Sequence, residues 1–216
     1  MLLSRRQIIQ AGAATGALAL AGSPAFAQEI ARLTVPAQPR AGVDPVVDPR
    51  LVARARASFD RHRAELQYTD VVGIADFTKA SSEPRFYLID TTNGAVTRHL
   101  VAHGRGSDPE HTGFLQRFSN QVRSEASSDG GYVTTEYYSS HFGRALRVRG
   151  LDYTNSNAEA RGLVIHTAWY AEPQVLANNG RLGRSEGCFA LSQAGLAEAM
   201  ARLGPGRFLY ADRLSA

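Results

Sequence analysis

The only cysteine of the 216-residue chain, Cys188, is the residue whose type and setting point most clearly to chemistry. It follows Gly187 in the stretch GRLGRSEGCFAL, residues 180–191, where polar and charged residues precede it. A cysteine that serves only for packing usually stands among apolar neighbours. His166 ends the apolar run GLVIH, 22 residues before Cys188. An imidazole beside a thiol raises the thiolate fraction and can return a proton to a leaving amine, so the pair predicts acyl transfer through a cysteine nucleophile.

This chemistry requires the thiol and the imidazole ring to meet in space. If His166 is the base, its ring should lie about 3–4 Å from the sulfur of Cys188. Gly187 would let the backbone approach closely, so that the N–H groups of Gly187 and Cys188 face a developing oxyanion. Each donor of a well-formed oxyanion hole contributes about 3–4 kcal/mol. The alternative is that His166 is a hydrogen-bonded structural residue and Cys188 a buried, inert thiol.

Four further residues are candidates for contacts with a substrate or with the thiolate. Arg184 could neutralise a substrate carboxylate or the thiolate, or it could make a structural salt bridge. His103, in the stretch AHGRGS, is either a polar group of the cleft or a hydrogen-bonded residue at the end of a strand. Tyr137 and Asn157 are weaker candidates for substrate binding.

Composition and spacing favour neither a metal nor a nucleic acid. His99 and His103, four residues apart, would face the same side of a strand and could suggest zinc, but no acidic or cysteine ligand follows at a usable spacing. Removing residues 1–27 takes away two arginines and no acidic residue, so the net charge falls from +4 to +2. Such a mildly basic surface suits an anionic cell-wall polymer and is too weak to indicate nucleic-acid binding. We therefore expect no metal and no cofactor.

The N-terminal residues predict export. Arg5 and Arg6 precede an uncharged run, and Ala25 and Ala27 supply a cleavage site, so residues 1–27 form an export signal. The arginine pair resembles the twin-arginine signal, and an ordinary secretory signal is the alternative. The apolar run is too short and too rich in Ala and Gly for a good membrane span, so we expect no membrane segment after processing and a periplasmic protein.

The rest of the chain predicts a tether and one domain. Residues 28–49 contain Pro36, Pro39, Pro45 and Pro49, which favour an extended tether. Residues 50–216 form the domain. Its first helix should begin at Asp48-Pro49 and present one stripe formed by Leu51, Ala55, Phe59, His62 and Leu66, in which His62 is a residue at the edge of the core rather than a ligand.

Most of the domain predicts strands. Residues 70–77 read as a strand, and residues 85–104 as a hairpin with a type I′ turn at Asn93-Gly94. Residues 104–131 should form long loops, residues 131–151 further strands, and residues 162–170 a central strand that carries His166. Ser192 should cap a helix that ends at Gly204-Pro205, before a last strand at residues 207–212. The expected fold is mainly β with flanking helices.

The motif VIHT…GRLGRSEGCFAL resembles the active-site signature of L,D-transpeptidases with a YkuD-type catalytic domain. The resemblance implies that Cys188 is the nucleophile and His166 its base, with Ser185 and Gly187 as motif residues that support them. The sub-branch called murein L,D-transpeptidase catalytic domain proteins shares the stretches DFTKASSEPRFYLID, VAHGRGS, FSN and GRLGRS-x-GC-x-AL. The similarity spans residues 68 to 212 and implies a YkuD-like β-sandwich or barrel.

Two positions depart from the family pattern. Glu186 stands where the family at large has a second histidine, and Ala190 stands where it has Arg or Asn. We expect both positions to line the cleft beside the nucleophile. A carboxylate close to the sulfur would raise the pKa of the thiol, whereas one turned to solvent would do little.

The resemblance implies a reaction on peptidoglycan stem peptides. Cys188 would attack the carbonyl of the third stem residue, expel terminal D-alanine, and pass the acyl group to a side-chain amine of a neighbouring stem. Water in place of the amine would make the enzyme an L,D-carboxypeptidase, and the bond between stem residues 1 and 2 is an alternative target. A papain-like amidase normally carries its cysteine before its histidine, and the order here is reversed. A non-catalytic peptidoglycan-binding module is the remaining alternative.

Overall fold

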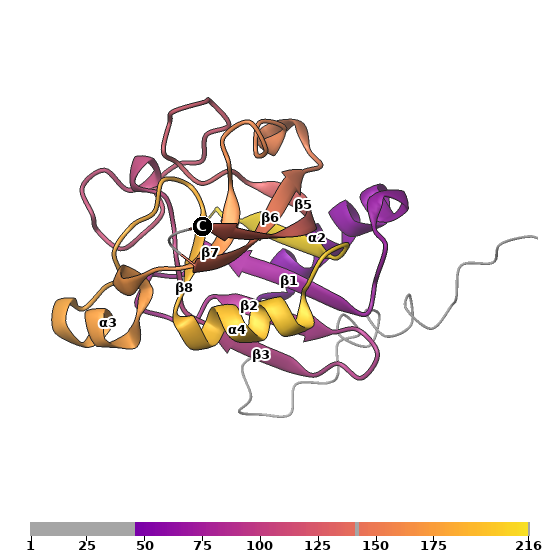
Figure 1. The fold of residues 1–216 in the computed structure, drawn as a ribbon, viewed down its shortest axis with the longest axis horizontal. Helices are drawn as coiled ribbons and strands as arrows, with labels where there is room; N and C mark the ends of the chain where they lie inside the picture. Colours follow the sequence, from indigo (N-terminus) through magenta and orange to yellow (C-terminus); the bar gives the residue numbers. More distant parts are fainter. Residues whose placement is uncertain (1–45, 141–142, 216) are drawn as a thin grey trace, which may run out of the picture.

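The computed structural model describes residues 46–140 and 143–215, so residues 1–45, with the expected export signal and most of the tether, lie outside the described part. Within that part the chain forms a nine-stranded sheet and three α-helices (Figure 1). The helices are α2 (Pro49–His62), α3 (Pro173–Asn179) and α4 (Gln193–Arg202). The strands are β1 (Val71–Asp76), β2 (Phe86–Asp90), β3 (Val96–His99), β4 (Val101–Ala102), β5 (Gly130–Ser140), β6 (Gly143–Gly150), β7 (Val164–Thr167), β8 (Phe189–Leu191) and β9 (Phe208–Asp212). The expected fold, mainly β with flanking helices, is confirmed.

The strand order brings the two edges of the sheet together. The order is β3-β2-β1-β9-β5-β6-β7-β8-β4, so β3 and β4 are the two edge strands. Yet Leu100 is the only residue between them in the chain. One residue can connect the two edges only if the sheet curls until they nearly meet, as in a barrel. The predicted hairpin therefore ends at His99, and the next residues pair with β8 instead of β2.

The turn between β2 and β3 differs from the expected one. A type I′ turn needs positive φ at both central residues. Gly94 has a φ of 75°, whereas Asn93 is not among the described residues with positive φ. The turn is instead organised by the Asp90 carboxylate, which accepts the backbone N–H groups of Thr92 and Asn93. The hairpin prediction is confirmed for β2 and β3, and the type I′ assignment is wrong.

The helices cover the sheet as their apolar patterns require. The Asp48 carboxylate caps α2, and Leu51, Ala55 and Phe59 are buried against β5 and β9. His62 lies at the edge of this packing, with Nε2 2.8 Å from the Asp152 carboxylate. Leu66 lies beyond the end of α2 but still packs against the core cluster that holds Leu51, Ala55 and Phe59.

The C-terminal helix packs on the strands that carry the candidate site. Ser192 caps α4 by accepting the Gly195 N–H, and the helix packs against β6, β7 and β8 (Figure 1). Leu196, Ala199 and Leu203 are buried there. The sequence did not predict α3, a short helix between β7 and β8. No helix among residues 46–140 and 143–215 has the length and apolar character that crossing a membrane requires.

Candidate active site

Two adjacent parallel strands place Cys188 and His166 on the same face of the sheet. Ile165 pairs with Phe189 in the register of β7 and β8, so Cys188, one residue before β8, stands opposite Val164. Alternate residues of a strand share a face. Ile165 and Phe189 therefore enter the core, whereas Cys188 and His166 line one cavity of about 820 Å³. The predicted pair is brought to one site.

The contacts of His166 fix the tautomer of its ring. Nδ1 lies 2.9 Å from the Thr167 carbonyl oxygen, which can only accept, so Nδ1 carries the proton. The other ring nitrogen, Nε2, is then left with a lone pair that can take a proton. Burial lowers the pKa of His166, although the hydrogen bond to Thr167 opposes the shift. At neutral pH the ring is therefore a neutral base.

The thiol of Cys188 is partly buried and rests in its neutral form. Sγ donates a long hydrogen bond, 3.9 Å, to the carbonyl oxygen of Gly162. Burial raises the pKa of Cys188; the Val164 N–H and the Arg161 charge lower it, and the Glu186 charge raises it. Among the described residues no hydrogen bond joins Sγ to the His166 ring, and the expected distance of about 3–4 Å stays a prediction. Hydrogen bonds of catalytic groups often tighten only when substrate is bound.

The turn before Cys188 requires glycine. Gly187 has a φ of 110°, and a Cβ there would lie 2.7 Å from the Ala126 carbonyl oxygen and 2.8 Å from Nη2 of Arg161. Ser185 closes the turn: its hydroxyl donates to the Cys188 carbonyl at 2.7 Å and accepts the Gly187 N–H at 3.2 Å. That N–H is therefore directed to Ser185, which leaves the Cys188 N–H as the expected oxyanion donor.

Arg184 and Glu186 both line the cavity. The charge of Arg184 is held by backbone carbonyl oxygens, whereas that of Glu186 lies at the exposed rim. The Arg184 guanidinium is bound by the carbonyl oxygens of Asp108 and Pro109, the latter at 2.9 Å. It thus anchors the loop and makes no salt bridge within the described part of the chain. Glu186 is 72% exposed at the rim and lies 3.2 Å from Arg105. Ala190, by contrast, is fully buried, so the expectation that it lines the cleft is wrong.

His103 lies beneath the site instead of in it. It is 1% exposed; Nδ1 is 2.7 Å from Nη2 of Arg85, and Nε2 is 3.3 Å from the Asp108 carboxylate. Burial, with the Arg85 charge, lowers the pKa of His103 to about 3, so the ring is neutral. Its carbonyl oxygen accepts the Ser185 N–H at 2.9 Å. His103 therefore supports the backbone that leads to Cys188.

Tyr137 and Asn157 also lie outside the cavity. The Tyr137 hydroxyl donates to the Met200 carbonyl on α4, 3.0 Å away. Asn157 bonds twice to Asn120, at 3.0 and 2.9 Å, and ties two loops together. The neighbour Tyr138 lines the cavity in place of Tyr137, since neighbouring residues of a strand face opposite sides.

Aromatic side chains that the sequence did not single out form another wall. Trp169 and Tyr170 line the cavity with their rings in edge contact, 5.8 Å between centroids. Trp169 is 78% exposed. An exposed tryptophan at a cavity offers apolar area to a ligand at little entropic cost.

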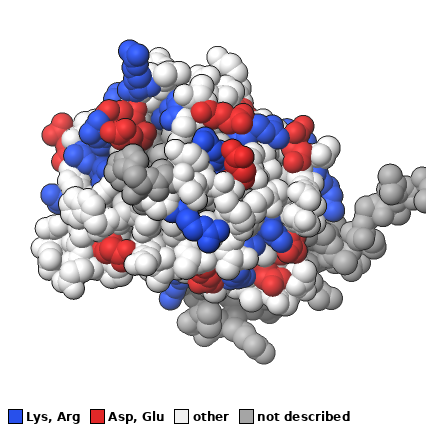
Figure 2. Space-filling view, viewed as in Figure 1, with Lys and Arg blue, Asp and Glu red and all other residues white. Residues whose placement is uncertain are grey.

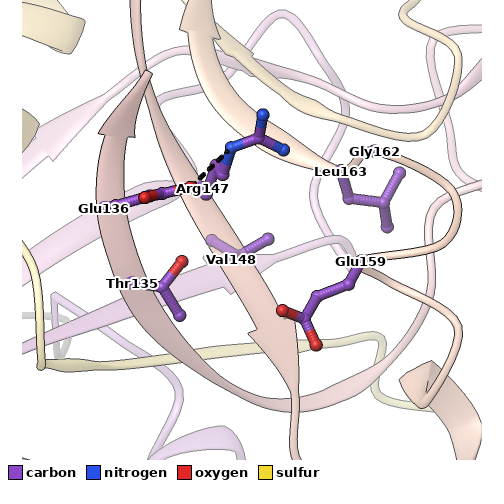
Figure 3. A pocket seen from close by; sticks show the side chains of 7 residues that line it. All are labelled: Thr135, Glu136, Arg147, Val148, Glu159, Gly162 and Leu163. Carbon is purple, nitrogen blue, oxygen red and sulfur yellow. Dashed lines mark ion pairs between the residues drawn. The ribbon is translucent and has the colours of Figure 1, made fainter.

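A smaller cavity is lined by Gly162 and Leu163, the residues before β7. It has a volume of about 330 Å³, and the ion pair of Arg147 with Glu136, 3.1 Å long, crosses one side of it (Figure 3). Glu159 comes from the opposite side in the same view. Gly162 lines this cavity, and its carbonyl oxygen accepts the Cys188 thiol.

Metal-ligand clusters and basic patches were two features that the sequence did not favour. In the part of the chain that the structure describes, no three His, Cys, Asp or Glu side chains form a group that could hold a metal ion. His99 pairs with Glu198, and His103 follows a different strand. On the face drawn in Figure 2, basic and acidic side chains are interspersed, without an extended basic patch.

Comparison with known proteins identifies the family to which the chain belongs. Residues 44–211 match the profile of the L,D-transpeptidase catalytic domain. The chain belongs to this family. The expected YkuD-like catalytic domain is thereby confirmed. A search of curated proteins returned no match.

The solved structures to which the chain is similar include L,D-transpeptidases. One from Mycobacterium smegmatis is 15% identical with a TM-score of 0.41, and the match covers 66% of this chain and 58% of that one. One from Mycobacterium tuberculosis is 18% identical with a TM-score of 0.41, covering 66% and 57%. One from Xylanimonas cellulosilytica is 15% identical with a TM-score of 0.38, covering 88% and 94%. The chain thus spans less than two thirds of the first two proteins, and the family assignment rests on the profile.

Proposed function

We propose that this protein is a peptidoglycan L,D-transpeptidase that cross-links stem peptides through a thioester on Cys188. The observation that carries the proposal is the placement of Cys188 and a neutral His166 on one face of β7 and β8, in a single cavity, within a family of this activity. The cavity volume suits a peptide end, since ligand sites commonly measure about 300–1,000 Å³.

The first half-reaction forms the acyl-enzyme. Nε2 of His166 takes the thiol proton, and Sγ attacks the carbonyl carbon of the third stem residue. The Cys188 N–H faces the oxyanion that develops. The carbon–nitrogen bond then breaks, and the imidazolium of His166 gives its proton to the departing amine of D-alanine. The products are a thioester on Cys188 and free D-alanine.

The second half-reaction releases the cross-link. A side-chain amine of a neighbouring stem attacks the thioester, loses a proton to His166, and displaces the thiolate, which takes the proton back. The donor peptide bond supplies the free energy, so no nucleotide is consumed. Water as acceptor gives the carboxypeptidase reaction at the same atoms. We propose a periplasmic location, since residues 1–27 carry the features of an export signal.

Incubation of purified sacculi with the protein, followed by mass analysis of muropeptides, tests this function. We expect new cross-linked species with the wild type and none with Cys188→Ala or His166→Ala. His62→Ala is the matched control, because this histidine contacts Asp152 and lies outside the cavity. Shortened stems without cross-links would indicate the carboxypeptidase. Binding to sacculi without any new muropeptide would indicate a wall-binding module.

A further inference from the structure

The guanidinium of Arg161 is held by neutral groups. Nη1 donates to the Ser119 carbonyl at 2.7 Å and to the Ser128 hydroxyl at 2.6 Å, and Nη2 donates to the Ala126 carbonyl. None of the ion pairs in the described part of the chain includes Arg161. The side chain is partly buried, and an arginine stays charged in proteins. A charge withdrawn from water without a counter-ion is costly, so this one calls for an anion.

Both the side chain and the backbone at Arg161 approach Cys188. Nη2 lies against Gly187, where a Cβ would come within 2.8 Å of it. The next residue, Gly162, offers its carbonyl oxygen to the thiol at 3.9 Å. Burial lowers the pKa of Arg161, while Tyr132 and then Cys188 raise it; in turn, the Arg161 charge lowers the pKa of Cys188 against the larger effect of burial.

The other charged and titratable groups around the thiol are neutral, paired or at the rim. They are Arg105, Tyr138, Arg144, His166, Tyr170, Arg184 and Glu186, of which Tyr138 is exposed at the rim with Arg147 stacked over its ring. Burial lowers the pKa of His166 and raises that of Tyr170 to about 12, so neither is charged at pH 7. Arg105 is paired with Glu186, Arg184 is bound to carbonyl oxygens, and Arg144 is exposed. Within the described residues Arg184 also lacks an ion pair, but its guanidinium is bound at Asp108 and Pro109, whereas Nη2 of Arg161 lies against Gly187, the residue next to Cys188.

We propose that the Arg161 guanidinium is the permanent counter-cation of the Cys188 thiolate. When the thiol proton moves to Nε2 of His166, the sulfur becomes negatively charged. The guanidinium that stabilises this charge is already held in place by hydrogen bonds to neutral groups. The assignment rests on Cys188 being the nucleophile of the proposed function and is independent of the acyl acceptor. It makes Arg161 an electrostatic partner of the nucleophile, acting without contact with substrate.

Alkylation kinetics of Cys188 test the assignment. The rate of modification by iodoacetamide is followed by intact-protein mass spectrometry from pH 5 to 10 in the wild type, Arg161→Gln and Arg161→Lys. A rise of about one unit in the thiol pKa slows alkylation about tenfold at pH values below both midpoints, and we expect a shift of this size for Arg161→Gln. Arg161→Lys should recover most of it because the charge remains. Arg213→Gln is the matched control, since this guanidinium bonds the Leu115 carbonyl away from the cavity.

Two results would overturn the assignment: a wild-type midpoint in Arg161→Gln, or equal shifts in the Gln and Lys variants, which would show that hydrogen bonds and not charge matter. If Arg161→Gln fails to fold, NMR on the folded wild type decides. The Arg161 side-chain resonances should titrate with the thiol midpoint and stay constant in Cys188→Ala; constant resonances in the wild type overturn the assignment. A wild-type Cys188 inert over the whole pH range would overturn the proposed function as well.

Discussion

Gly187→Ala should destabilise the fold in two ways, through backbone strain and through steric overlap of the added Cβ. A non-glycine residue at its φ of 110° is strained by about 1–2 kcal/mol. The added Cβ would also lie 2.7 Å from the Ala126 carbonyl oxygen and 3.2 Å from the Leu163 side chain, and overpacking of this kind costs about 1–3 kcal/mol. We expect a loss of about 2–5 kcal/mol in the free energy of unfolding. Because Cys188 is the next residue, a displacement of about 1 Å should also slow cross-linking on the order of a hundredfold.

Gly143→Ala is the matched control for stability. Gly143 has nearly the same φ, 106°, but a Cβ there meets nothing within 4 Å. Urea denaturation of both variants should therefore show a loss of about 1–2 kcal/mol for Gly143→Ala and a distinctly larger one for Gly187→Ala. Equal losses would refute the close packing of Gly187 against Ala126 and Arg161.

Three further outcomes are expected. Because burial lowers the pKa of His166, the acid limb of cross-linking activity should lie below pH 6.5; a limb above that value would contradict a neutral base in the resting enzyme. Because His103 titrates at about 3 in the fold against 6.5 unfolded, its contribution to stability is present above pH 6.5 and is lost as pH falls toward 3, by up to about 1.4 kcal/mol per pH unit; urea titrations should show His103→Gln with a shallower slope. Glu186→Gln removes an exposed carboxylate that raises the pKa of the thiol, so alkylation of Cys188 at pH 7 should become faster by a small factor, and slower alkylation would contradict this placement.

The sequence was sufficient to place the candidate pair Cys188 and His166 together because both are attached to short, regular elements. The apolar run that ends in His166 and the Gly-Cys turn before Phe189 predict strand ends, and parallel pairing brings them to one face. The same regularity implies that only one of Tyr137 and Tyr138 faces the cavity, since neighbouring strand residues face opposite sides. Only the orientation of the sheet decides which of them faces the cavity.

Other features depend on long-range packing that no local pattern encodes. The hairpin ends before Leu100 because the sheet closes there, and no sequence pattern in residues 96–102 predicts this. His103 is of a residue type that is common in clefts, but its contacts with Arg85 and Asp108 bury it. Arg161 acquires its role because distant loops supply Ser119, Ala126 and Ser128 as acceptors.

The covalent intermediate is the most direct test that Cys188 carries the reaction. The protein is mixed with a stem tetrapeptide that ends in D-alanine, quenched in acid within the first turnovers, and examined by intact-protein and peptide mass spectrometry. We expect a single adduct on Cys188 whose mass is that of the stem without D-alanine, lost on addition of an acceptor amine and absent in Cys188→Ala. Cross-linked product from Cys188→Ala, or product from the wild type without any adduct on Cys188, would contradict the proposed acyl-enzyme.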